Sequence, residues 1–220
     1  MSELVVETFR RGPFWNFSYL IGCAETREAF VIDPAWDVDA ILGAAAADSL
    51  EISTILLTHS HSDHVNGVSE LAERTRARVL AHSEESNGLR AAGISQFGTF
   101  SRAESLRLGR HELRLLPLPG HSEGSTAILV QGRAFTGDAL HVGGPGRPGP
   151  YPGAVEQLWG SLQQLCALDP DTVIHPGHDE GPSQTSTMGA EIARVPALAA
   201  ESPEALAEEL ERVTGRKHGV

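Results

Sequence analysis

The sequence predicts an α/β fold, in which strands and helices alternate along the chain. Short apolar runs rich in β-branched residues are typical of buried strands, and several are followed by segments with apolar residues at helical spacing. A chain of 220 residues and 23.5 kDa is long enough to bury a substantial core. We therefore expect one layered α/β domain over residues 1–220.

In the first half of the chain, strands are predicted to alternate with two helices. Residues 54–57 (Thr-Ile-Leu-Leu) form a continuous apolar run that opens with two β-branched residues, as a buried strand does. After it, Val65, Val68 and Leu71 recur at helical spacing and predict a helix that ends near residue 74. The other elements expected here are strands at 4–9, 18–23, 30–32 and 78–81 and a helix at 38–47.

In the second half, strands come first and helices follow. Residues 201–215 are rich in Ala, Glu and Leu and predict an amphipathic C-terminal helix, with Pro203 near its start. Residues 143–153 are rich in Gly and Pro and predict an irregular loop. His111, between two predicted strands, is expected to be exposed. The remaining elements are strands at 105–108, 113–118, 126–130, 133–136 and 172–174 and helices at 154–167 and 185–195.

Composition and charge exclude several classes of protein. With 17 basic and 29 acidic residues the formal charge is -12, and nucleic-acid binding needs basic patches, so no nucleic-acid partner is expected. No apolar run approaches membrane-spanning length, and the N-terminus lacks the pattern of a secretory signal, so we expect no membrane association and a cytoplasmic location. In that setting Cys23 and Cys166 are expected to be free thiols. The sequence leaves the oligomeric state open.

A cluster of histidines follows the strand predicted at 54–57. His59, His61, Asp63 and His64 lie within six consecutive positions, and imidazole and carboxylate groups are ligands that zinc and iron prefer. His59 and His61 are two residues apart, so in an extended segment they point the same way. Asp63 and His64 follow as the chain turns and point elsewhere. This loop can therefore serve two neighbouring ions.

Three further candidate ligands each follow another predicted strand. They are His121, Asp138 and His178, and each is preceded by a glycine, which permits a sharp turn or a close backbone approach. One such pair alone is typical of an ordinary turn. Four strand ends that carry His or Asp together indicate a metal centre, because ligands of open α/β sheets bind beyond the carboxyl ends of strands.

This pattern of seven residues resembles the metallo-β-lactamase superfamily, and most closely its glyoxalase II and persulfide dioxygenase branch, over residues 4–198. The resemblance implies a four-layer αβ/βα sandwich with the metals at one edge of the two sheets. It further implies that one ion is held by His59, His61 and His121. The second ion would be held by Asp63, His64 and His178, and Asp138 would bridge the two ions.

The reaction expected from such a centre is hydrolysis of an acyl bond. A metal-bound hydroxide would attack a carbonyl that the ions polarise, with Asp63 and Asp138 as the catalytic carboxylates. Two divalent ions are expected, zinc first, with iron or manganese as alternatives. The resemblance to glyoxalase II points to a thioester of a small-molecule thiol. Whether the thiol is glutathione stays open, because only about 25 residues follow Val195 and they are acidic up to Arg216.

Two other functions are compatible with the sequence. The first is a mononuclear iron enzyme of the persulfide dioxygenase type, in which a single Fe(II) is held by His59, His121 and Asp138. Against it, that subgroup has Gly-Cys-Gly-Arg-Thr-Asp-Phe where this chain has Pro145 in place of the cysteine and Pro-Gly-Pro after Arg147. The second is a non-catalytic metal-binding scaffold, although no ligand of the pattern is missing.

Three residues near Asp138 are candidate substrate contacts. Arg147 and Tyr151 lie in the Gly/Pro-rich segment and are suited to an anionic or polar group of the substrate. His141 lies three residues after Asp138 and is suited to a place beside the substrate or behind a ligand. A solvated arginine, a packing tyrosine and a loop histidine without a role are the alternative interpretations.

Overall fold

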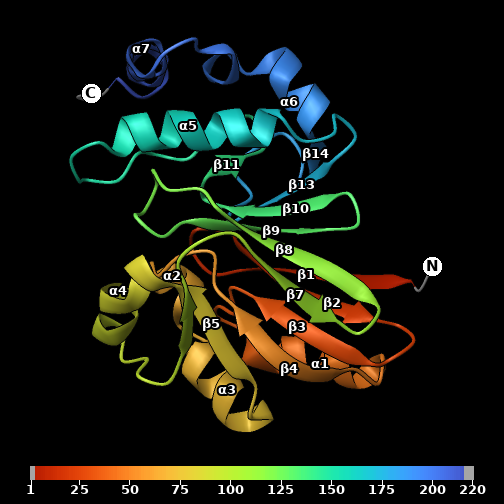
Figure 1. Cartoon of the computed structure of the whole chain (residues 1–220). Coiled ribbons are helices and arrows are strands. Elements are labelled where there is room, and N and C mark those ends of the chain that lie inside the picture. The colour runs from red at the N-terminus through yellow and green to blue at the C-terminus, as the bar shows by residue number, and fades with distance from the viewer. Residues whose placement is uncertain (1–2, 216–220) are drawn as a thin grey trace.

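Two six-stranded sheets form the centre of the molecule, and helices cover both outer faces (Figure 1). The structure is a computed structural model and describes residues 3–215. The layers follow the order helices, sheet, sheet, helices, which is the four-layer αβ/βα sandwich that the family resemblance implied. Among the described residues, no helix combines the length and apolar character that a membrane crossing requires.

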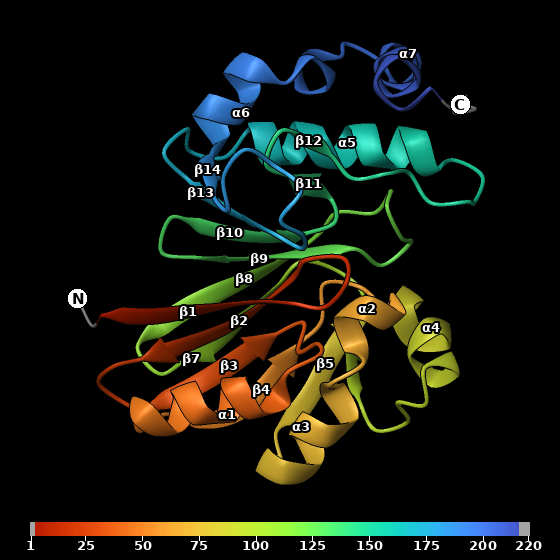
Figure 2. The ribbon, with the colours of Figure 1, turned by 180° about the vertical axis from the view of Figure 1, so that it is seen from behind.

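The first sheet is built from the N-terminal half of the chain. Its strands lie in sequence order, with β1 to β3 antiparallel and β3 to β6 parallel. Helices α1 (Val38–Ala47) and α3 (Val68–Thr75) pack on its outer face, and the shorter α2 (Ser62–Val65) and α4 (Ser86–Ala91) lie at one end (Figure 2). The strands are β1 (Leu4–Arg11), β2 (Asn16–Cys23), β3 (Glu28–Ile32), β4 (Glu51–Leu56), β5 (Arg78–His82) and β6 (Gly98–Phe100).

The second sheet is built from the C-terminal half. Its strand order is β14-β13-β10-β9-β8-β7. Strands β10 and β13 run parallel, and all other neighbouring strands of this sheet run antiparallel. Helices α5 (Ala154–Cys166), α6 (Met188–Arg194) and α7 (Pro203–Thr214) cover its outer face. The strands are β7 (Glu104–Leu108), β8 (His111–Pro117), β9 (Thr126–Val130), β10 (Arg133–Gly137), β13 (Val173–Pro176) and β14 (Ser186–Thr187), and β11 (Leu140–His141) pairs with β12 (Gly144–Pro145) beside them.

Three apolar cores fill the spaces between the four layers. The first joins α1 and α3 to the first sheet and contains Ile41 and Leu71. The second lies between the two sheets and contains Phe30 and Phe135. The third joins the second sheet to α5, α6 and α7. Central strands such as β2 and β10 are buried along almost their whole length, and the site lies beyond the strand ends.

Local sequence signals set the ends of two helices. The Asp37 side chain accepts a hydrogen bond from the backbone N–H of Ala40 and so caps α1. Ser202 caps α7 in the same way, Pro203 is its first residue, and Gly215 ends it in a left-handed conformation. The C-terminal helix predicted at 201–215 is therefore present, with the proline at the expected place.

Three local predictions differ from the structure, two of them only in part. The helix predicted after residue 64 is interrupted at Gly67, which passes so close to the carbonyl of Pro34 that a side chain there would clash. The segment predicted to be irregular contains the short strand β12. His111 was expected to be exposed but is buried, because it is the first residue of β8 and its side chain points inward.

Candidate metal centre

The seven residues singled out in the sequence come together at one edge of the two sheets. His59, Ser60 and His61 follow β4 and lead into α2, which carries Asp63 and His64. The other three follow β8, β10 and β13 of the second sheet: they are His121, Asp138 and His178. Strands of both sheets end at this edge, so the centre is assembled from four separate chain segments (Figures 1 and 2).

Backbone contacts close the edge on which the ligands lie. The N–H of Thr126 donates to the carbonyl of Thr58 across the two sheets (2.9 Å). The N–H of Phe17 donates to the carbonyl of Gly177 (2.8 Å), and Asn16 forms an isolated β-bridge with His178. The loops that carry the ligands are therefore tied together by main-chain bonds.

Two of the three glycines that precede candidate ligands pack closely against other loops of the centre. A side chain on Gly177 would collide with the Asp138 carboxylate and the His64 ring. Gly137 has a φ of +51°, and a side chain there would meet Thr58. These positions favour glycine because the ligand-bearing loops approach each other more closely than a Cβ atom allows.

Three histidines converge on one side of the centre, which we call subsite 1: His59, His61 and His121. The Nδ1 of His61 lies 3.0 Å from the Nε2 of His59 and 3.0 Å from the Nε2 of His121. His59 is buried, His121 is half-buried and His61 is exposed. With Asp138, their ligand atoms all lie within 4.8 Å of one another.

The other side, subsite 2, consists of Asp63, His64 and His178. The Nε2 atoms of the two histidines are 3.0 Å apart, and Asp63 Oδ2 lies 3.7 Å from His64 Nε2 and 3.5 Å from His178 Nε2. Both histidines are buried. Subsite 2 is therefore compact and largely closed to solvent.

Asp138 lies between the two subsites and faces both. Its Oδ2 is 3.5 Å from His121 Nε2 and 3.3 Å from His178 Nε2, and its Oδ1 is 3.5 Å from His64 Nε2. The carboxylate is buried, and its Oδ1 has no hydrogen-bond partner within residues 3–215. A buried carboxylate oxygen without a donor needs a cation or a water to compensate it.

Hydrogen bonds on the outer side of the rings show which nitrogens face inward. His178 Nδ1 lies 2.8 Å from the carbonyl oxygen of Phe14 and His121 Nδ1 lies 2.9 Å from that of Arg147, and a carbonyl can only accept. His64 Nδ1 lies 3.2 Å from the Asp33 carboxylate. Each Nδ1 must therefore donate, so each Nε2 is free to present a lone pair to the centre. Inward lone pairs beside a buried carboxylate fit divalent cations.

Burial and neighbouring charges shift the pKa values of these groups. Burial and the neighbouring His64 hold the pKa of His59 well below its usual range, so this ring is neutral at pH 7. Burial alone raises the pKa of Asp138, but the surrounding His64 and His178 outweigh it and the pKa lies well below its usual range. Burial lowers the pKa of His178, but its contact with Asp138 prevails and raises that pKa to about 9. A bound cation displaces that proton.

Sequence reasoning missed the residues that hold the ligands from behind. The Asp33 carboxylate accepts from the N–H and the hydroxyl of Thr58 (2.7 and 2.5 Å) as well as from His64. Asn16 donates from Nδ2 to Asp63 Oδ2 (2.9 Å), and Trp36 donates from Nε1 to Asn16 Oδ1 (3.0 Å). Asp33 was detectable, since it follows β3 at the same sheet edge as the ligands. The others carry no such signal.

The three candidate substrate contacts occupy different positions. The His141 ring lies 5.8 Å from that of His178, and burial lowers its pKa, so it adjoins subsite 2 as a neutral imidazole. Arg147 is exposed, and its backbone carbonyl, rather than its guanidinium, holds His121. Tyr151 is half-buried, its hydroxyl donates to Gln157 (3.2 Å), and burial raises its pKa to about 12.

The fold and the seven converging side chains define a protein with a His/Asp metal-binding centre between two sheets. A model of the metallo-beta-lactamase superfamily matches residues 11–178. That range includes all seven side chains of the two subsites. The chain therefore belongs to the metallo-β-lactamase superfamily.

Two hydroxyacylglutathione hydrolases are among the relatives of the chain. Those of Cereibacter sphaeroides and Alkalilimnicola ehrlichii are each 37% identical to it, over 166 and 164 residues. Each alignment covers 74% of this chain but only 62% and 61% of the respective relative. The chain thus spans about three fifths of the length of these enzymes.

Solved structures share nearly the whole fold. ETHE1 from Myxococcus xanthus is 29% identical, with a TM-score of 0.83, over 96% of this chain and 91% of that protein. TTHA1623, crystallised in a di-iron-bound form, is 32% identical, with a TM-score of 0.69, over 87% of this chain and 99% of that protein. A metallo-beta-lactamase from Staphylococcus aureus has the same fold at 24% identity (TM-score 0.86), covering 100% of this chain and 69% of that protein.

Proposed function

We propose that the protein is a dinuclear metallohydrolase that cleaves the thioester of a small-molecule thiol, in the manner of glyoxalase II. The observation that carries this proposal is the presence of two ligand groups that share Asp138, which lies within 3.5 Å of histidines from both. The similarity to hydroxyacylglutathione hydrolases supports the substrate class, since hydroxyacylglutathione is a thioester.

The ligands proposed for the first ion are the histidines of subsite 1, and those for the second ion are the residues of subsite 2. Asp138 would contact both ions. We favour zinc, while iron is supported by the di-iron form of the TTHA1623 relative, and manganese suits the same donors. When bound, the ions would polarise the carbonyl of the substrate and lower the pKa of a water molecule at the centre.

The residues of the centre have distinct tasks in this reaction. Asp63 faces the inner side of the centre and is proposed to accept a hydrogen bond from the attacking water, which orients it toward the carbonyl carbon. Burial raises the pKa of Asp63, but the hydrogen bond from Asn16 together with the nearby His64 and His178 outweighs it and lowers that pKa, so the carboxylate is ionised at neutral pH. Asp138 is proposed to fix the separation of the two subsites. The C–S bond breaks, and the products are a carboxylic acid and a thiol.

Three residues around the centre are proposed to contact the substrate. His141 is neutral and adjoins subsite 2, so it is suited to donate a hydrogen bond to the substrate. Arg147 is exposed on the loop that holds His121, and its guanidinium would bind an anionic group of the thiol. Tyr151 stays protonated at neutral pH and would serve as a hydrogen-bond donor.

Metal content and turnover together test the proposal. We would express the protein without added metal, measure its ions by mass spectrometry, and assay S-D-lactoylglutathione together with thioesters of other thiols by release of the free thiol. Close to two ions per chain with thioester hydrolysis is expected. Metal without turnover of any thioester would contradict the hydrolase.

A mononuclear iron oxygenase is the second candidate, and one observation favours it. His59, His121 and Asp138 form a set of two imidazoles and one carboxylate within a single group of ligand atoms. The exposed His61 beside them leaves that side open. One iron per chain with oxygen uptake on a persulfide substrate would replace the hydrolase by this alternative.

A further inference from the structure

A buried glutamate outside the ligand set joins the two loops of subsite 1. We propose that Glu85 is a positioning residue for this subsite: its carboxylate fixes the loop of His59 and His61 relative to the loop of His121. The inference rests on the proposed function, because it concerns the binding of the ion that subsite 1 would hold.

The contacts of Glu85 reach both loops at once. Its Oε2 accepts from the backbone N–H of Ser60, the residue between His59 and His61 (2.8 Å). Its Oε1 accepts from the Ser122 hydroxyl (2.6 Å) and from the backbone N–H of Gly124 (2.9 Å), just after His121. One carboxylate therefore binds three donors from two segments that are 60 residues apart in the chain, the separation of His61 and His121.

The surroundings of Glu85 are built to bring it to this place. Glu85 ends the short 3-10 helix Ser83–Glu85 after β5, and its side chain is only 3% exposed. Gly124 packs so closely against it that a side chain there would meet its Cγ and Oε1. Gly88, one turn further on, packs in the same way against Ser60. The two glycines allow this segment to press against both ligand loops.

An ionised carboxylate is the group that these donors require. Ser60 and Gly124 present backbone N–H groups, and a buried N–H without an acceptor is costly. Hydrogen bonds to a charged acceptor are stronger than those between neutral groups. A glutamine at position 85 would keep the shape, but its NH₂ group would face one of the donors. It would therefore release one of the two loops.

Subsite 1 depends on such a brace because His61 has little else to orient it. Among the described residues, the His61 ring bonds only to His59 and His121, themselves members of the subsite. The backbone bond from Thr126 to Thr58 holds the loop at its base, before His59. Glu85 grips the loop beyond His59, next to His61. Its loss is therefore expected to loosen subsite 1 and to leave subsite 2 intact.

The test is zinc binding to metal-free protein, measured by competition with a chromophoric chelator. We would compare wild type with Glu85→Gln and with Glu84→Gln, an exposed neighbour that undergoes the same change of charge. His121→Ala and His178→Ala identify which of the two affinities belongs to which subsite. We expect Glu85→Gln to weaken the ion of subsite 1 by about 10–100-fold, the range typical of partners behind a metal ligand, and to leave the other ion and Glu84→Gln unchanged.

Other outcomes would overturn the inference. Unchanged affinities in Glu85→Gln would remove the positioning role, while two bound ions in wild type would leave the proposed function intact. An equal loss at both subsites, together with a lower melting temperature of the metal-free protein, would make Glu85 a residue of general stability. No zinc bound by wild type would refute the proposed function itself. If Glu85→Gln does not fold, Ser122→Ala, which removes one of the three donors, must weaken subsite 1 alone, by less.

Discussion

The two halves of the metal centre differ in how firmly their ligands are held. In subsite 2 every ligand has a partner behind it: Asn16 for Asp63, Asp33 for His64 and the Phe14 carbonyl for His178. In subsite 1 the backbone carbonyl of Arg147 holds His121, but within residues 3–215 nothing outside the subsite holds the exposed His61 ring. Subsite 2 is thus prebuilt, whereas subsite 1 is open on one side.

The contrast indicates how the work is divided. Ligands that are fixed before binding lose less conformational freedom when a metal binds, so we expect the ion of subsite 2 to be the tighter one. The open side of subsite 1 leaves space for a substrate to reach the centre. Asp33 links the halves, because it holds His64 directly and holds the Thr58 hydroxyl, which in turn accepts from His59 Nδ1.

The largest effect is expected from the residue that the two halves share. Asp138→Ala removes the carboxylate that faces both subsites, and the imidazoles around it lose their shared anionic neighbour. We expect both ions to bind far more weakly and turnover to fall by more than about 1000-fold, beyond the 10–100-fold typical of residues behind a ligand. Metal stoichiometry and thiol release measure it. Full occupancy of either subsite in this variant would show that Asp138 does not serve both.

Acid is expected to destabilise the second sheet close to subsite 2, where His175 is buried. His175 lies on β13, is buried, and stacks on Phe135 of β10 at 4.6 Å, and burial and the nearby Arg133 lower its pKa to about 4. The ordinary histidine value is 6.5, so between pH 6.5 and 4 the unfolded chain binds more protons than the folded one. The contribution of His175 to the free energy of unfolding is therefore fully present above pH 6.5. It decreases by about 3 kcal/mol as the pH falls to 4.

The comparison with a variant isolates that contribution. His175→Gln lacks the titrating group, whereas the imidazoles of the metal centre titrate in both proteins. Urea unfolding of the two metal-free proteins at pH 7 and pH 4 gives the difference in their free energies of unfolding. Wild type should lose about 3 kcal/mol more than the variant. Equal losses would mean that His175 has the same protonation state in the folded and the unfolded chain.

Asp33 offers an intermediate effect that tests the link between the halves. Asp33→Asn keeps the shape but weakens the acceptor for His64 and for Thr58. Because its contact with subsite 2 is direct and that with subsite 1 passes through Thr58, we expect about a 10–100-fold loss at subsite 2 and a smaller loss at subsite 1. Zinc competition resolves the two. A loss confined to subsite 1 would contradict the prediction and reverse the assignment of the link.

The sequence predicted most of the fold because apolar periodicity and strand ends are local signals. The buried strand at 54–57 and the histidines after it were sufficient to place one ligand loop. The break of the helix at Gly67 was not visible, since it depends on the carbonyl of Pro34, which lies near only in the folded chain. His111 was misjudged for a similar reason, because burial of a strand's first residue depends on the neighbouring sheet.

The residues of the candidate site also separate into those that local sequence signals predict and those that they do not. The seven candidate ligands follow strands, so their positions can be predicted from the sequence, and all seven converge in the structure. The residues behind them belong to other strands and loops, and their role appears only when distant segments meet. Glu85 lies in a run of ordinary polar residues, and Asn16 and Trp36 lie near the first hairpin and after β3. Nothing in their local patterns distinguishes them from solvated side chains.

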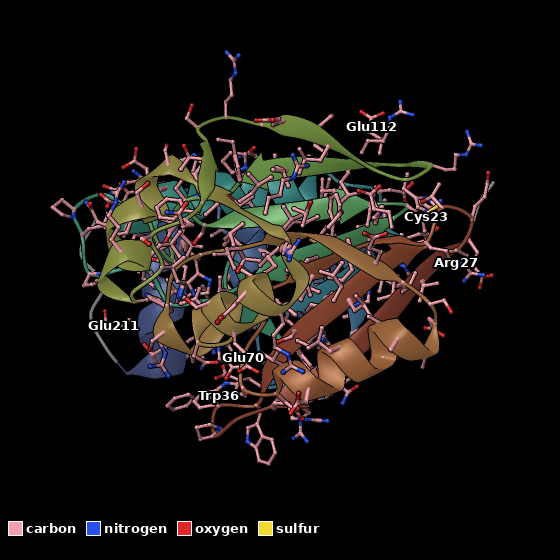
Figure 3. The ribbon with its side chains drawn as sticks, turned by 90° about the horizontal axis from the view of Figure 1, so that it is seen from below. Cys23, Arg27, Trp36, Glu70, Glu112 and Glu211 are labelled. Atoms are coloured by element: carbon pink, nitrogen blue, oxygen red, sulfur yellow. The ribbon has the colours of Figure 1, made fainter. Side chains whose placement is uncertain are left out.

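The smallest effect is expected at the outer end of a hydrogen-bond chain in subsite 2. Trp36 is 45% exposed and lies at the periphery of the molecule (Figure 3), yet its Nε1–H donates to Asn16, which donates to Asp63. The bond to Trp36 fixes the Asn16 amide so that its NH₂ group faces the carboxylate. Trp36→Phe keeps an aromatic ring and removes only the donor. The loss of one hydrogen bond, about 1 kcal/mol, should lower kcat about fivefold and leave KM unchanged.

The pattern of the rate constants decides what Trp36 does. A lower kcat with an unchanged KM indicates that the indole acts through Asn16 on the orientation of Asp63. A higher KM with an unchanged kcat would instead place the exposed ring in contact with the substrate. Asn16→Ala removes the next bond of the same chain, so Trp36→Phe should add nothing in that background. An additive loss in the double variant would mean that the two residues act independently, and the orientation of Asp63 would then depend on Asn16 without Trp36.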